Sequence, residues 1–281
     1  MKLRYRLLNV FALPGQPLTG NPLCVFEDGS GLTDATMQAL ALQFNLSETT
    51  FILPSDKATA RVRIFTPAME LPFAGHPTLG TAQVVRALRS AGDAITLETQ
   101  AGVIPVSARG NAWTLTANAP TTRPLDTTRL AELAAALGLG TGDVAATPLW
   151  VNTGMEQLVV PLASRARVGG LTPNAGVSAF ANNLGKVSVY CISPVDEPEM
   201  DVRFFFSKNQ GSVAEDPATG SACANLGGYL IGTQAALPAV RVLHQGAAVG
   251  RPSILHLAIS AEGSITVGGE VIELGAGTLA L

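Results

Sequence analysis

The stretch AEDPATGSACANLGGYL, residues 214–230, places two acidic residues and a proline directly ahead of a run of small residues. The helix that this run predicts carries few charges and is small-sided nearly all round, which is typical of a helix enclosed by sheet. Glu215 and Asp216 have two interpretations. Acidic side chains suit any helix start, where amide N–H groups lack partners and the helix dipole favours negative charge. Alternatively, an acid at this place faces a ligand pocket.

A second segment has the same pattern. HPTLGTA at 76–82 and DPATGSA at 216–222 both read x-Pro-x-x-Gly-[Thr/Ser]-Ala, and they lie 140 residues apart. Each follows a strand-like run rich in Phe and Arg, RVRIFTP at 61–67 and DVRFFF at 201–206. Similarity at a separation of about half the chain indicates two similar halves, each a sheet folded around a central helix.

The remaining pattern predicts a mixed α+β protein. Short strand-like runs bounded by Gly, Pro, Asp and Ser dominate the chain. Helices are expected at 32–45, 77–92, 128–140 and 217–232. We expect an N-terminal half over 1–117, completed by a C-terminal strand at about 270–281, and a C-terminal half over 118–269.

Composition limits the possible functions. The chain has 281 residues, 14% of them charged and with a net charge of −3, and no Lys/Arg cluster that would mark a nucleic-acid surface. Its N-terminus has only a short, broken apolar run, unlike a signal peptide, and no stretch reaches transmembrane length. Cys24, Cys191 and Cys223 are odd in number and far apart, which favours a reducing compartment. We therefore expect a cytoplasmic protein that binds neither nucleic acid nor membranes.

The two helix starts would form one site if both halves presented them to a shared cleft. Proline at the first helical position would place His76 and Asp216 at the two N-caps. Backbone N–H groups near Gly80 and Thr81, and at 220–222 in the other half, would then favour a carboxylate or a phosphate. Glycine at the fourth place would let a ligand approach the backbone.

Three polar residues are candidates for chemistry. Asp216 is either an N-cap acid or a ligand-facing carboxylate. His76 is either a structural or capping histidine, or a group that titrates and binds a ligand. Glu48, within FNLSETTFIL, is either a solvated or capping acid or a carboxylate carried into the cleft by a rigid strand. Partial burial there would raise the pKa of Glu48 and suit it to general base catalysis.

Other catalytic classes lack their motifs. Ser221, His76 and Asp216 have the residue types of a hydrolase triad, but no G-x-S-x-G turn occurs. Ser221 falls in the first turn of a predicted helix, where it is better placed to hold an anion than to attack a carbonyl. The absence of H-x-x-E-H, C-x-x-C, G-x-G-x-x-G and G-x-x-x-x-G-K patterns predicts neither a metal site nor a nucleotide site.

Longer motifs resemble one known family. GNPLCVFED, NLSETTFIL, RIFTPAMELPFAGHPTLGTA, EDPATGSACANL and HQGAAVGRPS occur in this order. Together, from about Leu8 to Gly269, they resemble the PhzF family of phenazine-biosynthesis isomerase-like proteins, which is related in fold to diaminopimelate epimerase. The resemblance implies two similar halves with a ligand cleft between them. It also implies a cofactor-free, metal-free isomerase, often a homodimer, whose namesake reaction moves a proton within trans-2,3-dihydro-3-hydroxyanthranilate.

The resemblance also implies roles for individual residues. Glu48 would be the acid/base that takes a proton from carbon, while His76 and Asp216 would bind polar groups of the substrate and relay protons. Gly220 and Ser221 would hold the substrate's carboxylate. The substrate-binding set predicted in this way is Gly75, Thr219, Gly220 and Ser221.

Two alternatives remain open. An amino-acid racemase or epimerase needs acids on both faces of its substrate, for which the diaminopimelate epimerases use two cysteines. The helix starts here show His76 and Asp216 instead, and Cys223 lies inside its helix. A non-catalytic protein that binds small molecules would also keep the cleft. The segments FSKNQGSVAEDP (206–217) and NTGMEQLVV (152–160) would help shape specificity in either case.

Overall fold

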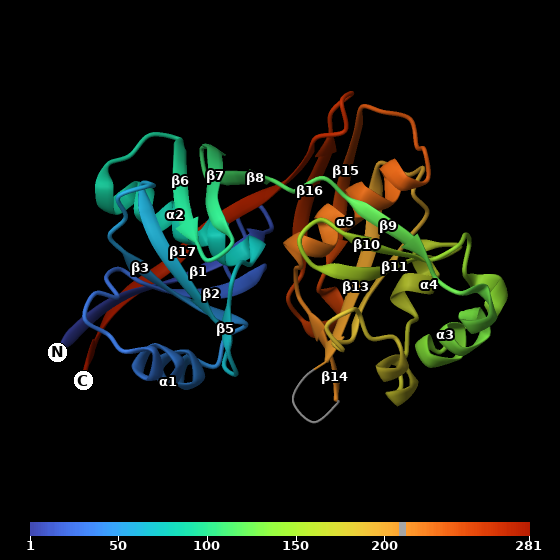
Figure 1. The fold of residues 1–281 in the computed structure, drawn as a ribbon, viewed down its shortest axis with the longest axis horizontal. Coiled ribbons are helices and arrows are strands. Elements are labelled where there is room, and N and C mark those ends of the chain that lie inside the picture. The colour runs from blue at the N-terminus through green and yellow to red at the C-terminus, as the bar shows by residue number, and fades with distance from the viewer. Residues whose placement is uncertain (208–211) are drawn as a thin grey trace. The chain divides into compact units, whose positions relative to one another are not determined.

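The computed structural model describes residues 1–207 and 212–281 and divides into two compact units. Unit 1 contains Met1–Thr116 and Gly268–Leu281, and unit 2 contains Ala117–Val267. Figure 1 shows one helix, α2 (Gly75–Arg89), among the strands of unit 1 and another, α5 (Gly220–Gly232), among those of unit 2.

Unit 1 is a closed ring of strands around α2. Its strands are β1 (Lys2–Ala12), β2 (Asn21–Phe26), β3 (Glu48–Leu53), β4 (Ala60–Phe65), β5 (Glu70–Leu71), β6 (Ala94–Thr99), β7 (Gly102–Arg109), β8 (Ala112–Thr116) and most of β17 (Ile265–Ala280). The ring runs β1–β2–β3–β4–β6–β7–β8–β17 and returns to β1. The β2–β3 and β4–β6 pairs are parallel, and α1 (Asp34–Phe44) packs against β3 and β4.

The sequence of α2 explains why it can lie inside this ring. The run from His76 to Ala82 is buried at every position, and α2 contacts β1, β2, β3, β4, β6 and β8. A Cβ atom at Gly80 would overlap the side chains of Leu23 and Val10. The expectation that Gly80 admits a ligand is therefore wrong, because side chains of β2 and β1 fill the space that its missing side chain leaves.

Unit 2 repeats the same order of strand pairs. Its strands are β9 (Thr121–Pro124), β10 (Leu149–Asn152), β11 (Glu156–Pro161), β12 (Ser188–Ile192), β13 (Glu199–Ser207), β14 (Val213–Asp216), β15 (Ala239–Gln245) and β16 (Ser253–Ile259). The parallel pairs β11–β12 and β13–β15 correspond to β2–β3 and β4–β6, and the antiparallel pairs β10–β11, β12–β13 and β15–β16 also have counterparts. The predicted α+β fold, with each half a mostly antiparallel sheet around a central helix, is confirmed.

An arginine–glutamate pair recurs at the same place in both units. Arg63 Nε and Nη2 donate to the two carboxylate oxygens of Glu70 at 2.7 and 2.6 Å. Arg203 binds Glu215 in the same way, at 3.0 and 2.7 Å. Each guanidinium also lies 5.1 Å from the ring of the phenylalanine two positions further along its strand.

These pairs correct the alignment of the two halves. Because Glu70 and Glu215 occupy equivalent positions, ELPFAGH at 70–76 corresponds to EDPATGS at 215–221, and the helices are 145 rather than 140 residues apart. The strands before them keep the separation of 140, so unit 2 has five more residues between strand and helix. His76 is therefore equivalent to Ser221 and not, as the repeated Pro-x-x-Gly motif predicts, to Asp216.

The helix starts differ accordingly from the prediction. His76 is the second residue of α2, whose N-cap is Ala74. Asp216 is the last residue of β14, and the N-cap of α5 is Thr219. Neither His76 nor Asp216 is an N-cap, because each helix begins at the glycine of the E-x-P-x-x-G sequence, three residues after its proline.

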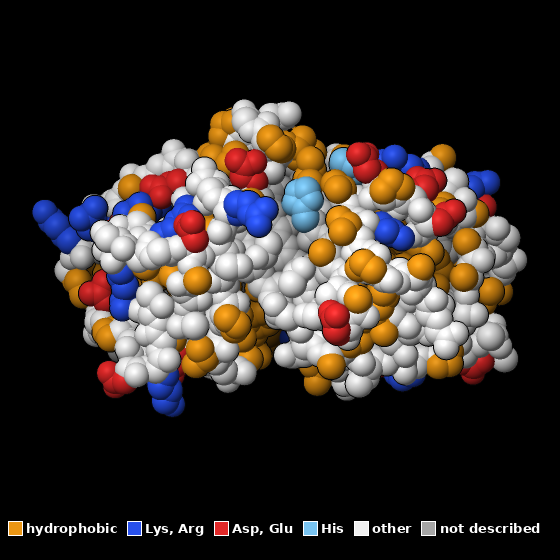
Figure 2. Space-filling model, turned by 90° about the horizontal axis from the view of Figure 1, so that it is seen from above, with side chains coloured by type: hydrophobic (Ala, Val, Ile, Leu, Met, Phe, Trp, Pro, Cys, Tyr) orange, Lys and Arg blue, Asp and Glu red, His pale blue; other side chains and the backbone are white. Residues whose placement is uncertain are grey.

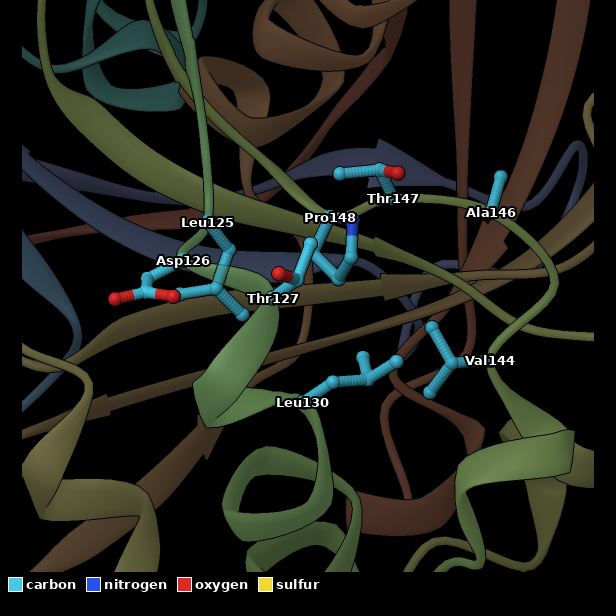
Figure 3. Close-up of a pocket in the computed structure, with 8 residues that line it drawn as sticks. All are labelled: Leu125, Asp126, Thr127, Leu130, Val144, Ala146, Thr147 and Pro148. Atoms are coloured by element: carbon cyan, nitrogen blue, oxygen red, sulfur yellow. The ribbon is translucent and has the colours of Figure 1, made fainter.

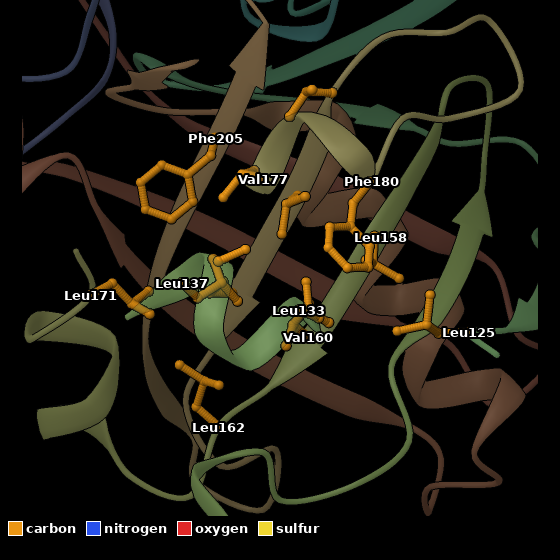
Figure 4. Packing of buried hydrophobic residues seen from close by; sticks show 14 of the residues in the cluster. Leu125, Leu133, Leu137, Leu158, Val160, Leu162, Leu171, Val177, Phe180 and Phe205 are labelled. Atoms are coloured by element: carbon orange, nitrogen blue, oxygen red, sulfur yellow. The ribbon is translucent and has the colours of Figure 1, made fainter. Parts of the chain in front are cut away.

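Within the described part of the chain, unit 2 has further, mostly short helices besides α5. They are α3 (Leu130–Leu137), α4 (Arg165–Gly169) and the short 3-10 turns η1 (Thr127–Arg129), η2 (Thr141–Asp143), η3 (Ala175–Ala179) and η5 (Ala247–Val249). Leu133 and Leu137 of α3 pack with Leu158 and Val160 of β11 and with Phe180 in a buried cluster (Figure 4). This second core leaves α5 enclosed on one face of the sheet and α3 on the other.

Two surface properties bear on function. No helix within the described residues is long and apolar enough to cross a membrane. Basic and acidic side chains are interspersed on the face shown in Figure 2.

Candidate active site

In unit 1 the fold brings Glu48 and His76 together. Glu48 is the first residue of β3, and His76 follows the first residue of α2. Glu48 Oε2 lies 3.3 Å from His76 Nε2, and the two side chains are 16% and 6% exposed. Further along the same elements, Thr50 and Thr81 share a hydrogen bond of 2.8 Å. That bond ties β3 to α2 and holds the acid against the imidazole.

Burial controls the protonation of His76. It lowers the pKa of His76 from 6.5 to about 3, and a hydrogen bond to the backbone of Pro22 only partly opposes the effect. Proline has no N–H, so a ring N–H of His76 donates to the Pro22 carbonyl. Because Nε2 faces Glu48, this N–H is the one on Nδ1. The imidazole is therefore neutral near pH 7 and turns the lone pair of Nε2 toward the carboxyl group of Glu48.

In unit 2 a buried glutamine organises Asp216 and Thr219. Thr219 Oγ1 donates to Asp216 Oδ2. Gln245 Nε2 donates to the Asp216 carbonyl at 2.9 Å and to Thr219 Oγ1 at 3.0 Å, and its Oε1 accepts from the Thr219 N–H. Gln245 is 2% exposed. Sequence reasoning missed Gln245, whose only signal was its place at the end of a strand in HQGAAVGRPS.

The turn after Gln245 lies directly against this cluster. Gly246 has φ 80°, and a Cβ atom there would overlap the carbonyl oxygens of Pro217 and Arg251. Only glycine combines this backbone conformation with so close an approach. The turn at Gly246 therefore packs directly against Pro217, the residue that follows Asp216.

The start of α5 offers donors to an anion. The first i→i−4 hydrogen bond runs from the Cys223 N–H to the Thr219 carbonyl. The N–H groups of Gly220, Ser221 and Ala222 precede it and have no partner within the helix. Ser221 Oγ accepts a hydrogen bond of 3.0 Å from Gln157 Nε2. Three amides and a hydroxyl at a helix N-terminus suit a carboxylate.

The predicted residues thus form two groups. Glu48 and His76, with Gly75 adjacent, lie together in unit 1, and Asp216, Thr219, Gly220 and Ser221 lie together in unit 2. Gly80 and Thr81 are interior residues of α2, so the expected anion seat near them is wrong.

The two segments expected to shape specificity have different outcomes. Within 206–217, residues 208–211 lie outside the described residues. The segment 152–160 contributes Thr153, Met155 and Gln157 to a buried polar cluster against α5.

The cysteines are unsuited to proton transfer. Cys24, Cys191 and Cys223 are free and buried, and burial raises the pKa of each thiol. A thiol of this kind stays protonated near pH 7. Within the described residues, no group of His, Cys, Asp or Glu side chains is arranged to hold a metal ion.

A separate pocket of about 230 Å³ opens beside α3 in unit 2 (Figure 3). Leucine, valine, alanine, proline and threonine side chains line most of it. Its one carboxylate, Asp126, already accepts hydrogen bonds from the N–H and hydroxyl of Thr128. The pocket therefore lacks the reactive side chains that the two groups above contain.

Comparison with known proteins identifies the family. The family model PhzC-PhzF, described as phenazine biosynthesis-like protein, matches residues 8–275. The chain belongs to the PhzF family. An isomerase of Pasteurella multocida, named as uncharacterized, is 38% identical over 98% of this chain and 93% of its own. The trans-2,3-dihydro-3-hydroxyanthranilate isomerase of Pseudomonas aeruginosa is 36% identical over 90% of this chain and 89% of its own.

A solved structure agrees with this assignment. A predicted epimerase from Pseudomonas aeruginosa superimposes with a TM-score of 0.84 and 34% identity, covering 99% of each chain. Family membership and the names of the PhzF relatives show that this chain is an isomerase.

Proposed function

We propose that this chain is a cofactor-independent isomerase that transfers a proton within a small carboxylate-bearing metabolite, with Glu48 as the general acid/base. The substrate class follows from the relative that is named trans-2,3-dihydro-3-hydroxyanthranilate isomerase. The observation that carries the proposal is the 3.3 Å approach of Glu48 Oε2 to His76 Nε2.

The contact between Glu48 and His76 suits reversible proton transfer. Nε2 of the neutral imidazole and an ionised carboxylate oxygen are both acceptors, so a proton between them stabilises the contact. Once Glu48 has taken a proton from substrate carbon, the Nε2 lone pair can accept a hydrogen bond from the new carboxylic acid. Glu48 can then return that proton to another carbon, which completes an isomerisation without net change in the enzyme.

The start of α5 would stabilise the charge that develops on the substrate. Removal of a proton from carbon leaves negative charge that spreads into the unsaturated system and the carboxylate. Fixed amide donors at a helix N-terminus stabilise such charge without reorganising during the reaction. In the proposal, Gly220 and Ser221 hold the carboxylate, and Asp216 with Thr219 binds a polar group of the substrate.

A racemase or epimerase is the second candidate, and the structural neighbour named as a predicted epimerase favours it. Inversion at carbon needs an acid on each face of the substrate. In the proposal the second acid would be Asp216, since burial keeps the thiol of Cys223 protonated. Inversion with uptake of solvent deuterium at the inverted carbon would favour this candidate over the isomerase.

Glu48→Gln tests the proposal directly. The amide keeps the shape of the side chain but cannot take a proton from carbon, so turnover of trans-2,3-dihydro-3-hydroxyanthranilate and its deuterium uptake from D2O should fall by about 100-fold or more. The affinity of Glu48→Gln for the same compound, measured by calorimetry, should change little. Glu262→Gln, which alters an exposed turn carboxylate, is the matched control. Undiminished exchange in Glu48→Gln would remove Glu48 from the mechanism.

A non-catalytic binding protein would give a different result in the same experiment. It would bind the carboxylate in calorimetry, and neither wild type nor Glu48→Gln would incorporate deuterium. We further propose a homodimer in the cytoplasm, as in the family that the motifs resemble. The three free, buried cysteines support a reducing compartment.

A further inference from the structure

Ser221 Oγ ends a buried chain of hydrogen bonds in unit 2. Asn225 Oδ1 accepts from the N–H and the hydroxyl of Thr153, at 2.9 and 2.7 Å. Asn225 Nδ2 donates to the Met155 carbonyl at 2.9 Å and to Gln157 Oε1 at 2.8 Å. Gln157 Nε2 then donates to Ser221 Oγ at 3.0 Å. Gln157 and Asn225 are both fully buried.

Two backbone groups fix the direction of the whole chain. The Thr153 N–H can only donate, so the Asn225 atom that faces it must be the oxygen. The Met155 carbonyl can only accept, so the other Asn225 atom must be the nitrogen. It follows that Gln157 turns its oxygen toward Asn225 and its NH2 group toward Ser221. Backbone groups therefore determine which end of each amide is the oxygen and which is the nitrogen.

The amide orientation determines what Ser221 can do. An NH2 group only donates, so Ser221 Oγ must accept from Gln157, and the hydroxyl hydrogen must point elsewhere. We propose that Gln157 is a positioning residue that keeps Ser221 as a hydrogen-bond donor toward the carboxylate of the substrate. This inference rests on the proposed function, in which Ser221 binds that carboxylate.

Equivalent positions in unit 1 can be found from strand register. Cys24 on β2 lies opposite Thr49 on β3, and Leu158 on β11 lies opposite Val189 on β12. Thr49 and Val189 in turn pair with the equivalent phenylalanines of β4 and β13. Cys24 and Leu158 are therefore equivalent, and so are the residues that precede them.

This equivalence shows that packing alone does not require the two amides. Gln157 corresponds to Leu23, and Asn225 corresponds to Gly80. In unit 1 the Leu23 side chain fills the space over Gly80, so an apolar pair packs the helix against the strand. Buried amides are costly unless every polar group is satisfied. Unit 2 has amides where unit 1 has leucine and glycine. These two amides form the hydrogen-bond chain that ends at Ser221.

The test compares a carboxylate probe with its neutral amide. 2-Aminobenzoate and 2-aminobenzamide are fluorescent and differ only in that group. Ser221→Ala and Gln157→Leu should each weaken 2-aminobenzoate binding by about 10-fold, the size expected of a hydrogen bond to a charged group. Binding of 2-aminobenzamide should stay within about 2-fold. The double variant should bind 2-aminobenzoate no more weakly than Ser221→Ala alone, because the two residues act through one hydroxyl.

Two further variants separate orientation from packing. Gln157→Glu keeps the shape but only accepts, so the Ser221 hydroxyl would turn inward, and affinity for 2-aminobenzoate should fall further than in Gln157→Leu. Gln157→Leu combined with Asn225→Gly copies the apolar pair of unit 1, and should fold while still losing the carboxylate preference. In turnover of trans-2,3-dihydro-3-hydroxyanthranilate, KM should rise more than kcat falls.

The outcomes distinguish this inference from the proposed function. If Ser221→Ala loses carboxylate affinity but all Gln157 variants keep it, the positioning role is wrong and the carboxylate seat stands. If Ser221→Ala keeps full affinity, or if wild type binds both probes equally, the proposed seat at α5 is itself wrong.

Discussion

His76 and Ser221 occupy the same position in the two units: each is the second residue of the helix that its strands surround. The side chains around them differ. His76 lies against the carboxyl group of Glu48, whereas Ser221 accepts from the amide of Gln157. The residue equivalent to Glu48 in unit 2 is Ser188, which is buried. The repeat thus keeps the architecture and differs in polar side chains, with a carboxyl–imidazole contact in one unit and a hydroxyl–amide hydrogen bond in the other.

The buried imidazole predicts a pH dependence of stability. The unfolded chain binds a proton at His76 below about pH 6.5, whereas the native protein does not until about pH 3. Between these values the unfolded state holds more protons, so stability falls as pH decreases, by up to about 1.4 kcal/mol per pH unit from this group. In His76→Gln this contribution should vanish, and the free energy of unfolding in urea should fall less steeply between pH 6 and 4.

His244→Gln serves as the control for this experiment, since His244 is more than a third exposed on β15. In His244→Gln the free energy of unfolding should fall with decreasing pH as steeply as in wild type. Parallel curves for wild type and His76→Gln would show that His76 takes up its proton in the folded state as readily as in the unfolded chain.

Two glycines test how far the turn after β15 supports Asp216. Gly246 and Gly250 both have positive φ, at 80° and 70°, so alanine strains the backbone at each by about 1–2 kcal/mol. Only at Gly246 would the new Cβ atom overlap the carbonyl oxygen of Pro217. Gly246→Ala should therefore unfold at lower urea concentration than Gly250→Ala and should also reduce kcat, because Pro217 adjoins Asp216.

Both variants share the backbone strain, so the difference between their stabilities measures the effect of the overlap between the new Cβ atom and Pro217. Equal stability and equal kcat would mean that the turn can move away from Pro217 without disturbing Asp216.

The repeated arginine–glutamate pairs should differ in strength. Arg63 keeps Asp34 as a second partner when Glu70 is neutralised, at 2.6 Å. Among the described residues, Arg203 would retain the backbone carbonyls of Leu171 and Val168. Glu215→Gln should therefore cost about 2 kcal/mol, and Glu70→Gln measurably less.

Each unit contains one buried tryptophan, Trp113 in unit 1 and Trp150 in unit 2, so fluorescence can follow each variant. Trp113→Phe and Trp150→Phe backgrounds would report unfolding of unit 2 and unit 1 separately. A larger loss of stability from Glu70→Gln than from Glu215→Gln would contradict the role of Asp34 as a second partner of Arg63.

Local patterns predicted much of the fold. Thr33 is the N-cap of α1, where its hydroxyl accepts from the Thr36 N–H, and Gly138 ends α3 in the left-handed conformation, two residues before the end of the expected helix at 128–140. Such signals lie within a few residues of the feature they predict, so they can be read without knowing the fold. The internal repeat could also be detected, because its strands and helix starts keep similar residues.

Aligning the two halves by their similar motifs places the two helices out of step, because similarity between short motifs takes no account of strand register. HPTLGTA and DPATGSA match well, yet Glu70 and Glu215 occupy the equivalent places on their strands. Five additional residues between strand and helix in unit 2 displace one motif relative to the other. Only the pairing of β4 with β5 and of β13 with β14 reveals this shift.

The sequence by itself determined that each half contains an enclosed helix, placed to within three residues, and that Glu48 opens an apolar strand. Tertiary structure decided that Glu48 meets His76, that Gln245 binds Thr219, and that Gln157 donates a hydrogen bond to Ser221. Helix caps and apolar periodicity depend on neighbours along the chain. These contacts depend on which distant strands pair and in what register, since the register decides which side chains face the enclosed helix.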